Sequence, residues 1–262
     1  MNLLLLTDFS HHAMHSHRYA LELYKNRPIN VFLLHVKKPC VNTEKCSGSC
    51  KLALHQKLNT DLQSLSNVNK EATYKSLMAE GSFIEEVRAA IIKHNIDLLV
   101  IGAKGKSTQN EAAIGSHTHA IATKVKCPVL IVFENSTLMN PSRILFPVNY
   151  TDALYPACLD KLKNLPDWEN LEIFILELKP LTVAEHLVLS SKQILEDNLS
   201  TELSVTFFNK EKHQVKLTKE SAAYDLMVFA AKNLSVGNQV FSELKTNKGA
   251  LPNQAPLFVL HA

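Results

Sequence analysis

The sequence lacks several features that mark whole classes of protein. No apolar run approaches the roughly 18 residues that predict a membrane span. The short run Leu3–Leu6 is interrupted at once by Thr7 and Asp8 and has no cleavage site, so we expect a strand there rather than a signal peptide. The net charge is only +3, too small to indicate nucleic-acid binding. We therefore expect neither a membrane nor a nucleic acid among its partners.

Cysteine is scarce and odd in number. Five cysteines without a predicted signal peptide favour a reducing cytoplasm over a disulfide framework. The length of 262 residues suits two domains of ordinary size, and a hydrophobic content of 46% supports a packed core for each.

The connection between one predicted strand and the predicted helix that follows it is rich in glycine. The apolar run Ile96–Gly102 has the length and branching of a buried parallel strand, and Ser116–Val125 is typical of a helix with Ser116 at or near its N-cap. Glycines stand at both ends of the connection: Gly102, Gly105 and Gly115. Glycine allows a positive φ and a close approach to a ligand, and the first amides of a helix favour an anion. The pattern predicts a phosphate-binding loop, with an ordinary tight strand–helix connection as the alternative.

The loop matches neither of two common nucleotide motifs. A Walker A loop needs glycine where Val100 stands, and the dinucleotide fingerprint G-x-G-x-x-G is absent. The spacing Gly-x2-Gly-x9-Gly-Ser, followed by a helix and Cys127–Phe133, resembles instead the nucleotide loop of the universal stress protein family. Leu3–Ser10 resembles that family's first strand and acidic turn, and Leu33–Val36 the end of its second strand.

The resemblance implies a cytoplasmic, ATP-binding stress-response protein whose ligand is ATP, with or without Mg²⁺. It places backbone amides and a hydroxyl on the phosphates, from Gly102, Gly105, Gly115 and Ser116. Lys104 adds charge there or is merely solvated, and His117 contacts the phosphates or faces solvent. Asp8 contacts the ribose or a metal, or forms only an Asx-type turn, while the backbone of Val36 reads the adenine. The sequence shows no recognisable pair of a nucleophile and a general base. We therefore expect no catalytic residue, and we expect any ATP hydrolysis to be slow.

Strands alternate with helices through the first part of the chain. We expect strands at Leu3–Leu6, Ile29–Val36, Ala72–Met78, Ile96–Gly102 and Cys127–Phe133, and helices near Ser10–Tyr24, Leu52–Leu65, Ser82–His94 and Ser116–Val125. A capping box, Ser82 with Glu85, is predicted to open the third helix. The inward positions of the first helix are Ala13, Tyr19, Ala20 and Leu23. This alternation predicts a parallel sheet with helices on both faces and a ligand site beyond the carboxyl ends of the strands.

The pattern repeats after a joint near residues 134–141. Arg143–Thr151 echoes the first strand and turn, Ile173–Leu178 the second strand, and Asp225–Lys232 lies over Asp97–Lys104 without a gap. The fold class is therefore α/β, with two tandem Rossmann-like domains of the adenine-nucleotide alpha hydrolase type. Each is a five-stranded, mostly parallel sheet flanked by helices, at residues 1–137 and 142–262. We expect Val129–Phe133 to pair with Leu257–Leu260 as an internal pseudo-dimer; a homodimer of the chain stays open.

The second domain is expected to lack the nucleotide site. A gapless alignment at an offset of 128 puts Ala230, Asn233 and Glu243 at the positions of the three loop glycines. At the amino end the offset between the halves is 141, which puts Asn149 at the position of Asp8. Glu243 would then place a carboxylate where a phosphate should lie.

Cysteines and histidines supply the remaining candidates. Cys40, Cys46 and Cys50 could hold zinc, act as redox-responsive thiols, or belong to an insertion in which they have no role. The first helix carries His11, His12, His15 and His17, which we interpret as exposed, with a His11–His15 metal pair as the alternative. Cys127 and Cys158 are expected to be small core residues.

Overall fold

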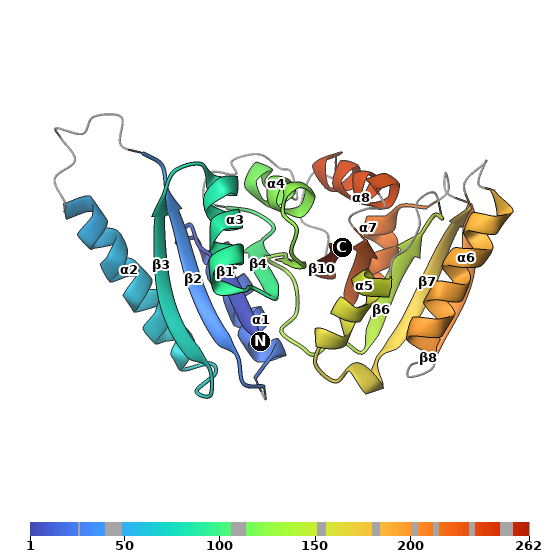
Figure 1. Ribbon diagram of the computed structural model, residues 1–262, viewed down its shortest axis with the longest axis horizontal. Helices are drawn as coiled ribbons and strands as arrows, with labels where there is room; N and C mark the ends of the chain where they lie inside the picture. Colours follow the sequence, from blue (N-terminus) through green and yellow to red (C-terminus); the bar gives the residue numbers. More distant parts are fainter. Residues whose placement is uncertain are drawn as a thin grey trace.

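The computed structural model describes residues 1–25, 27–39, 49–105, 114–150, 156–179, 184–200, 204–211, 215–230, 234–246 and 254–261. Its strands form one ten-stranded sheet in the order β3-β2-β1-β4-β5-β10-β9-β6-β7-β8. We call the part from β1 to β5 the first half and the part from β6 to β10 the second half. In Figure 1 the two halves stand side by side, blue to green and yellow to red.

The bounds of the elements follow the expected alternation. The first half has strands β1 (Asn2–Leu6), β2 (Asn30–Lys37), β3 (Thr73–Glu80), β4 (Leu98–Gly102) and β5 (Val129–Val132), and helices α1 (His11–Leu23), α2 (Ser49–Ser66), α3 (Phe83–His94) and α4 (Ser116–Lys124). The second half has strands β6 (Arg143–Val148), β7 (Glu172–Lys179), β8 (Ser204–Glu211), β9 (Leu226–Ala230) and β10 (Leu257–Leu260). Its helices are α5 (Pro156–Leu159), α6 (Glu185–Leu195), α7 (Leu217–Glu220) and α8 (Leu234–Thr246), with short helical turns at Asp160–Asn164, Trp168–Asn170, Glu196–Ser200 and Ser221–Ala223.

The sheet is parallel within each half and antiparallel where the halves meet. β10 pairs with β5 in antiparallel register, with Leu257 opposite Ile131 and Val259 opposite Val129. The predicted internal pairing of the fifth strands and the predicted fold class are confirmed. Because this pairing continues the backbone ladder, the fifth strand of each half is an inner strand of one sheet rather than an exposed edge.

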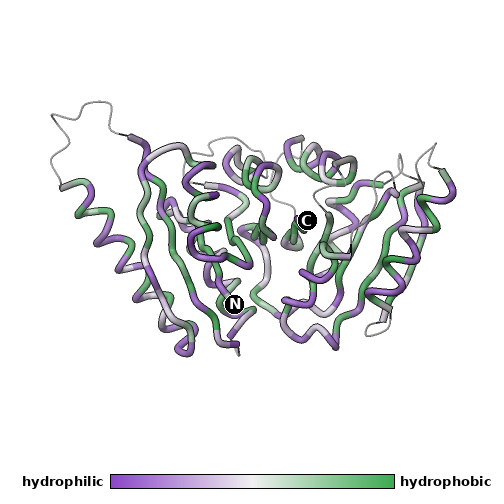
Figure 2. The backbone as a smooth tube through the Cα atoms, in the orientation of Figure 1, coloured by the Kyte–Doolittle hydropathy of each residue, from purple (hydrophilic) through white to green (hydrophobic). Residues whose placement is uncertain are grey.

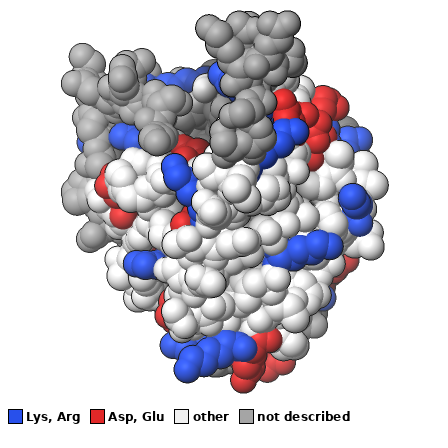
Figure 3. Space-filling model, turned by 90° about the vertical axis from the view of Figure 1, so that its left-hand side faces the viewer, with Lys and Arg blue, Asp and Glu red and all other residues white. Residues whose placement is uncertain are grey.

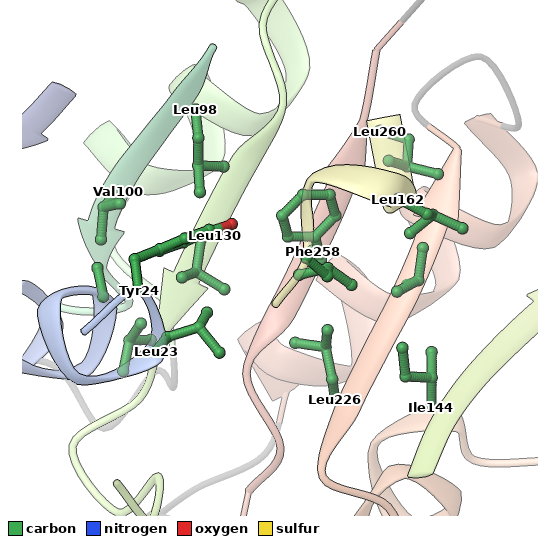
Figure 4. Close-up of a cluster of buried hydrophobic side chains, with 14 of the residues drawn as sticks. Leu23, Tyr24, Leu98, Val100, Leu130, Ile144, Leu162, Leu226, Phe258 and Leu260 are labelled. Carbon is green, nitrogen blue, oxygen red and sulfur yellow. The ribbon is translucent and has the colours of Figure 1, made fainter. Parts of the chain in front are cut away.

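Alternate residues of each strand pack into two hydrophobic layers, one on each face of the sheet. Leu3 and Leu5 belong to the layer covered by α1 and α2, whereas Leu4 and Leu6 belong to the layer covered by α3 and α4. The central strands β1, β4, β5, β9 and β10 are apolar along most of their length, as expected for strands buried on both faces (Figure 2). Figure 4 shows that the first layer is continuous across the junction, where Leu130 of β5 and Phe258 of β10 lie side by side.

The helix starts confirm one sequence expectation and correct another. Ser10 is the N-cap of α1, where its hydroxyl oxygen accepts the amide N–H of Ala13 at 3.2 Å. The four inward positions predicted for α1 are all buried. Ser82 is also an N-cap, of α3, but its side chain accepts no capping hydrogen bond, so the predicted capping box is not formed. Glu85 instead accepts a hydrogen bond from Arg88 at 3.0 Å.

The two halves differ between the fourth strand and the helix that follows it. Residues 103–115 connect β4 to α4, whereas residues 231–233 connect β9 to α8. The gapless alignment of Glu243 with Gly115 is therefore wrong, because Glu243 lies in the last turn of α8 and not at its entrance. There its carboxylate accepts the amide N–H groups of Leu217 and Thr218 at the start of α7. The second half has exchanged the long glycine loop for a longer helix.

The surface shows charges of both signs on the face that carries α2 and β3. In Figure 3 Lys and Arg side chains are spread among neutral residues, with Asp and Glu beside several of them. Among the helices that the structure describes, none combines the length and the apolar character needed to span a membrane.

Candidate functional site

A cavity of about 80 Å³ opens beyond the carboxyl ends of β1 and β4. Its walls come from β1 and the turn after it, from α1, from α3, from the end of β4 and from the first turn of α4. The lining residues are Leu6, Thr7, Asp8, Ala13, Phe83, Ile101, Gly102, Lys104, Gly105, Gly115, Ser116, His117 and Thr118. Every nucleotide-site residue chosen from the sequence is among them except Val36.

The first turn of α4 is fixed to the end of β4 by two hydrogen bonds. The hydroxyl of Thr118 donates to the carbonyl oxygen of Gly102 at 2.9 Å, and the amide of Gly115 donates to the carbonyl oxygen of Ala103 at 2.7 Å. Gly115 is the N-cap of α4, and the first turn of this helix contains no acidic residue. The positive end of the helix and its first amides are therefore held beside the cavity, and the first turn of the helix itself supplies no carboxylate that would neutralise them.

The loop glycines act by allowing close approach rather than by adopting a positive φ. Among the described glycines only Gly81 has a positive φ, so Gly102, Gly105 and Gly115 do not use the left-handed conformation that glycine allows. A Cβ atom on Gly102 would lie 3.0 Å from the backbone oxygen of His12. The missing side chain thus lets α1 pack directly on the end of β4. A Cβ on Gly105 would lie 2.8 Å from Oδ2 of Asp8.

Asp8 forms the Asx-type turn that was one of its two expected roles, whereas its contact with a ribose or a metal stays a prediction. Its Oδ1 accepts the amide N–H of Ser10 at 3.0 Å, which is the Asx-type turn. Its Oδ2 lies on the side of Gly105, so the same carboxylate also borders the cavity. The turn therefore holds an acidic group in place at the mouth of the site.

His117 lines the cavity while its side chain remains exposed. Its ring stacks on Phe83 of α3, with the ring centroids 4.3 Å apart and the planes inclined by 17°. The pair closes the side of the cavity between α3 and α4. Lys104 also lines the cavity and is half-buried.

The turn after β1 contains a feature that the sequence analysis missed. Phe9 has a φ of 62°, a left-handed conformation that is unfavourable for a bulky residue. Tyr150, which stands 141 residues later at the end of β6, has a φ of 56°. The offset of 141 already aligned the two turns, so the shared aromatic could have been noticed, but its backbone conformation could not. Both halves therefore place an aromatic residue in this strained conformation at the matching position after their first strand.

A buried imidazole supports the floor of the site. His17 is fully buried, so the interpretation of the four α1 histidines as exposed is wrong for this residue; His11 is exposed, and His12 and His15 are half-buried. The His17 Nε2 atom hydrogen-bonds the carbonyl oxygen of Leu6 at 2.9 Å, while Nδ1 has no partner among the described residues. Burial lowers the pKa of His17 to about 4, so the ring is neutral at pH 7.

Two groups of predicted residues lie apart from the cavity. Val36 is near the carboxyl end of β2, paired with Ala79 of β3, and is not part of the cavity wall. Cys40 and Cys46 lie outside the described residues, and Cys50 is in the first turn of α2. The buried thiols Cys127 and Cys158 are core residues, as expected, and burial raises the pKa of Cys127 to about 12.

The corresponding region of the second half holds a buried polar cluster. The Tyr150 hydroxyl donates to Oε1 of Glu177 at 2.6 Å, and the Lys192 ammonium lies 2.7 Å from the same oxygen. Burial and the Glu177 carboxylate raise the pKa of Tyr150 above its ordinary range. Glu177 occupies the β7 position that matches His35 in β2. The His35 ring packs against Phe9 in a tilted arrangement, with the ring centroids 4.6 Å apart. The two halves therefore share a turn but differ in the side chains that surround it.

Comparison with known proteins identifies relatives of both the first half and the whole fold. The family model described as the universal stress protein family matches residues 1–132. The universal stress protein YxiE of Bacillus subtilis is 28% identical over 126 residues, which cover 43% of this chain and 85% of the relative. A crystal structure of a universal stress protein from Archaeoglobus fulgidus matches with a TM-score of 0.70 and 14% identity, covering 99% of this chain and 96% of that chain.

A universal stress protein solved in complex with cAMP aligns with 50% of this chain and 96% of its own, at 17% identity. Its TM-score of 0.40 is too low for that ligand to bear on this chain. The family model covers half of the sequence, the Archaeoglobus structure shares the fold across both halves, and the strand order is that of two parallel units joined through their fifth strands. The chain belongs to the universal stress protein family, in a tandem arrangement of two such units.

Proposed function

We propose that the first half binds one adenine nucleotide, ATP with or without Mg²⁺, in the cavity between β1, β4 and α4. The observation that carries the proposal is the convergence of residues chosen from the sequence alone on the wall of one cavity. Ligands of parallel α/β sheets bind beyond the carboxyl ends of the strands, which is where this cavity lies.

The described groups suit a polyphosphate. The first amides of α4 and the Ser116 hydroxyl would contact phosphate oxygens, and Lys104 would add a positive charge. Asp8 would hold Mg²⁺, because this ion is usually bound by one or two carboxylates together with phosphate oxygens. Val36 keeps its proposed role through its backbone, beside the adenine. None of these groups is proposed to activate water, so we infer a binding and regulatory role in the stress response, with hydrolysis slow at most.

We propose that the second half binds no nucleotide. Its connection from β9 to α8 lacks the residues that form the loop in the first half, and Tyr150, Glu177 and Lys192 form a charged cluster at the matching turn. Domain limits at 1–137 and 142–262 and a cytoplasmic location belong to the same proposal. The location rests on the odd number of cysteines.

The test is a thermal shift measurement with ATP, with and without Mg²⁺, and with AMP as a second ligand. A ligand that binds only the folded state increases the free energy of unfolding and so raises the Tm. At a ligand concentration of 100 times the Kd this increase is about 2.7 kcal/mol. We expect the shift in the wild-type protein and its loss in Gly115→Glu, which puts a carboxylate at the N-cap of α4. The backbone of Gly115 is extended, with φ −80° and ψ 158°, so glutamate fits it without strain.

The matched control is Thr123→Glu, which adds the same charge to the exposed end of α4 far from the cavity. This variant should keep the full shift. A full shift in Gly115→Glu, or none in the wild type at millimolar ATP, would refute the site.

A further inference from the structure

Two neighbouring histidines of α1 converge on one carboxylate at the end of β5. His11 Nε2 lies 3.0 Å from Oε1 of Glu134, and His12 Nδ1 lies 3.5 Å from Oε2 of the same residue. One nitrogen from each ring and the carboxylate lie within 4.8 Å of one another. The i, i+4 spacing of a helical metal pair had suggested His11 with His15 instead. Successive helical residues do not normally face the same point, yet His11 and His12 both reach Glu134.

We propose that His11, His12 and Glu134 bind a divalent transition-metal cation of the zinc class. Zinc binds imidazole nitrogen and carboxylate oxygen at about 2.0–2.2 Å in a tetrahedral array. Neighbouring ligand atoms in such an array stand roughly 3.3 Å apart. The nitrogen–oxygen distances of 3.0 and 3.5 Å are close to that value but involve the two different oxygens of Glu134. One ligand atom from each residue lies within 4.8 Å of the other two, so rotation of the side chains toward a common point would bring them around one ion.

The number and type of ligands favour zinc over magnesium. Two imidazoles and one carboxylate are the ligand set of sites that keep a fourth position for water, whereas Mg²⁺ prefers oxygen ligands. His12 also lines a recess of about 20 Å³ with Lys104, Phe133 and Glu134, which has room for about one water molecule beside the proposed ion.

Other charges and contacts around the three residues affect how tightly the site would bind a metal. The positive charge of Lys104 is close enough to disfavour a cation at His12, whereas the negative charge of Asp8 favours one there. The side chains of His11 and Glu134 are 74% and 50% exposed, so the site is open to metal from solvent. His15, one turn further along α1, is committed to the carbonyl oxygen of Ser136 at 3.1 Å. A bound ion would join the first turn of α1 to the residue that follows β5, next to the proposed nucleotide cavity.

The experiment is a titration of chelator-treated full-length protein with Zn²⁺ by calorimetry, in the absence of nucleotide. Cys40, Cys46 and Cys50 are replaced by serine throughout, so that zinc binding by these cysteines cannot contribute. We expect one Zn²⁺ per chain and no Mg²⁺ binding. His11→Ala and Glu134→Gln should each weaken the zinc affinity by at least about tenfold, since even the loss of a residue supporting a ligand costs this much.

His15→Ala is the matched control and should leave the zinc affinity within about twofold of the parent, with an unchanged circular dichroism spectrum for all variants. His11 is exposed, so its replacement does not threaten the fold. The proposal is overturned if the parent with Cys40, Cys46 and Cys50 replaced takes up no stoichiometric zinc, or if His11→Ala and Glu134→Gln bind it as tightly as this parent. Both results are independent of whether ATP binds.

Discussion

The buried imidazole of His17 makes the stability of this protein sensitive to mild acid. The unfolded chain protonates the ring near its ordinary pKa of 6.5, whereas burial keeps it neutral in the folded protein until about pH 4. The unfolded state therefore binds more protons between these two values, and the free energy of unfolding falls as the pH is lowered through them. The stabilisation is complete above pH 6.5.

The magnitude follows from the width of that window. Each pH unit inside it costs about 1.4 kcal/mol, so lowering the pH from 7 to 5 costs about 2 kcal/mol through His17 alone. Burial also lowers the pKa of His261 to about 4, so the whole protein should lose more than this. The contribution of His17 is isolated by comparison with His17→Gln, whose amide cannot titrate.

Urea unfolding at pH 7 and pH 5 provides the assay. The loss of stability between the two pH values should be about 2 kcal/mol smaller in His17→Gln than in the wild type. His186→Gln, at an exposed position of α6, should show the wild-type loss. If His17→Gln loses as much stability as the wild type, the imidazole is not held neutral by burial and the reasoning fails.

Three further substitutions test the fold around the site. Gly102→Ala should destabilise the protein by about 1–3 kcal/mol in urea unfolding, because the new Cβ meets the backbone of α1. The control Ala230→Gly, at the matching position, should cost about 1 kcal/mol or less, and equal costs would contradict the close-approach argument. Glu177→Gln should cost about 1–3 kcal/mol by weakening the bonds to Tyr150 and Lys192, whereas an unchanged urea midpoint would show that the cluster is not stabilising. Phe258→Ala should cost about 3–5 kcal/mol and lower the Tm of both halves together, because the Phe258 ring belongs to the hydrophobic layer that the halves share. Unfolding in two separate steps would show that the halves are independent.

The periodic features of the fold could be predicted from the sequence. Apolar strands alternating with helices predicted the parallel sheet, and Asp225–Lys232 over Asp97–Lys104 predicted the repeat. The pairing of Leu257 with Ile131 followed from the resemblance and from the need to cover two sheet edges. These features depend on burial along whole elements, which leaves a strong pattern in the chain.

Features that depend on contacts between distant residues could not be predicted. A gapless alignment placed Glu243 at a helix entrance, because sequence offset alone does not show that the loop was exchanged for helix. The sequence around His17 does not distinguish it from the other histidines of α1, and its burial depends on the contact of its ring with the carbonyl oxygen of Leu6. The meeting of His11 and His12 with Glu134 joins positions more than 120 residues apart and depends on how α1 packs beside β5.

The stoichiometry of ATP binding to the full-length chain tests the central claim most directly. Calorimetry should give one nucleotide per chain for the wild type and no binding for Gly115→Glu, because only the first half has Gly102, Gly105 and Gly115 between the end of its fourth strand and the following helix. Two nucleotides per chain, or one that persists in Gly115→Glu, would contradict the account.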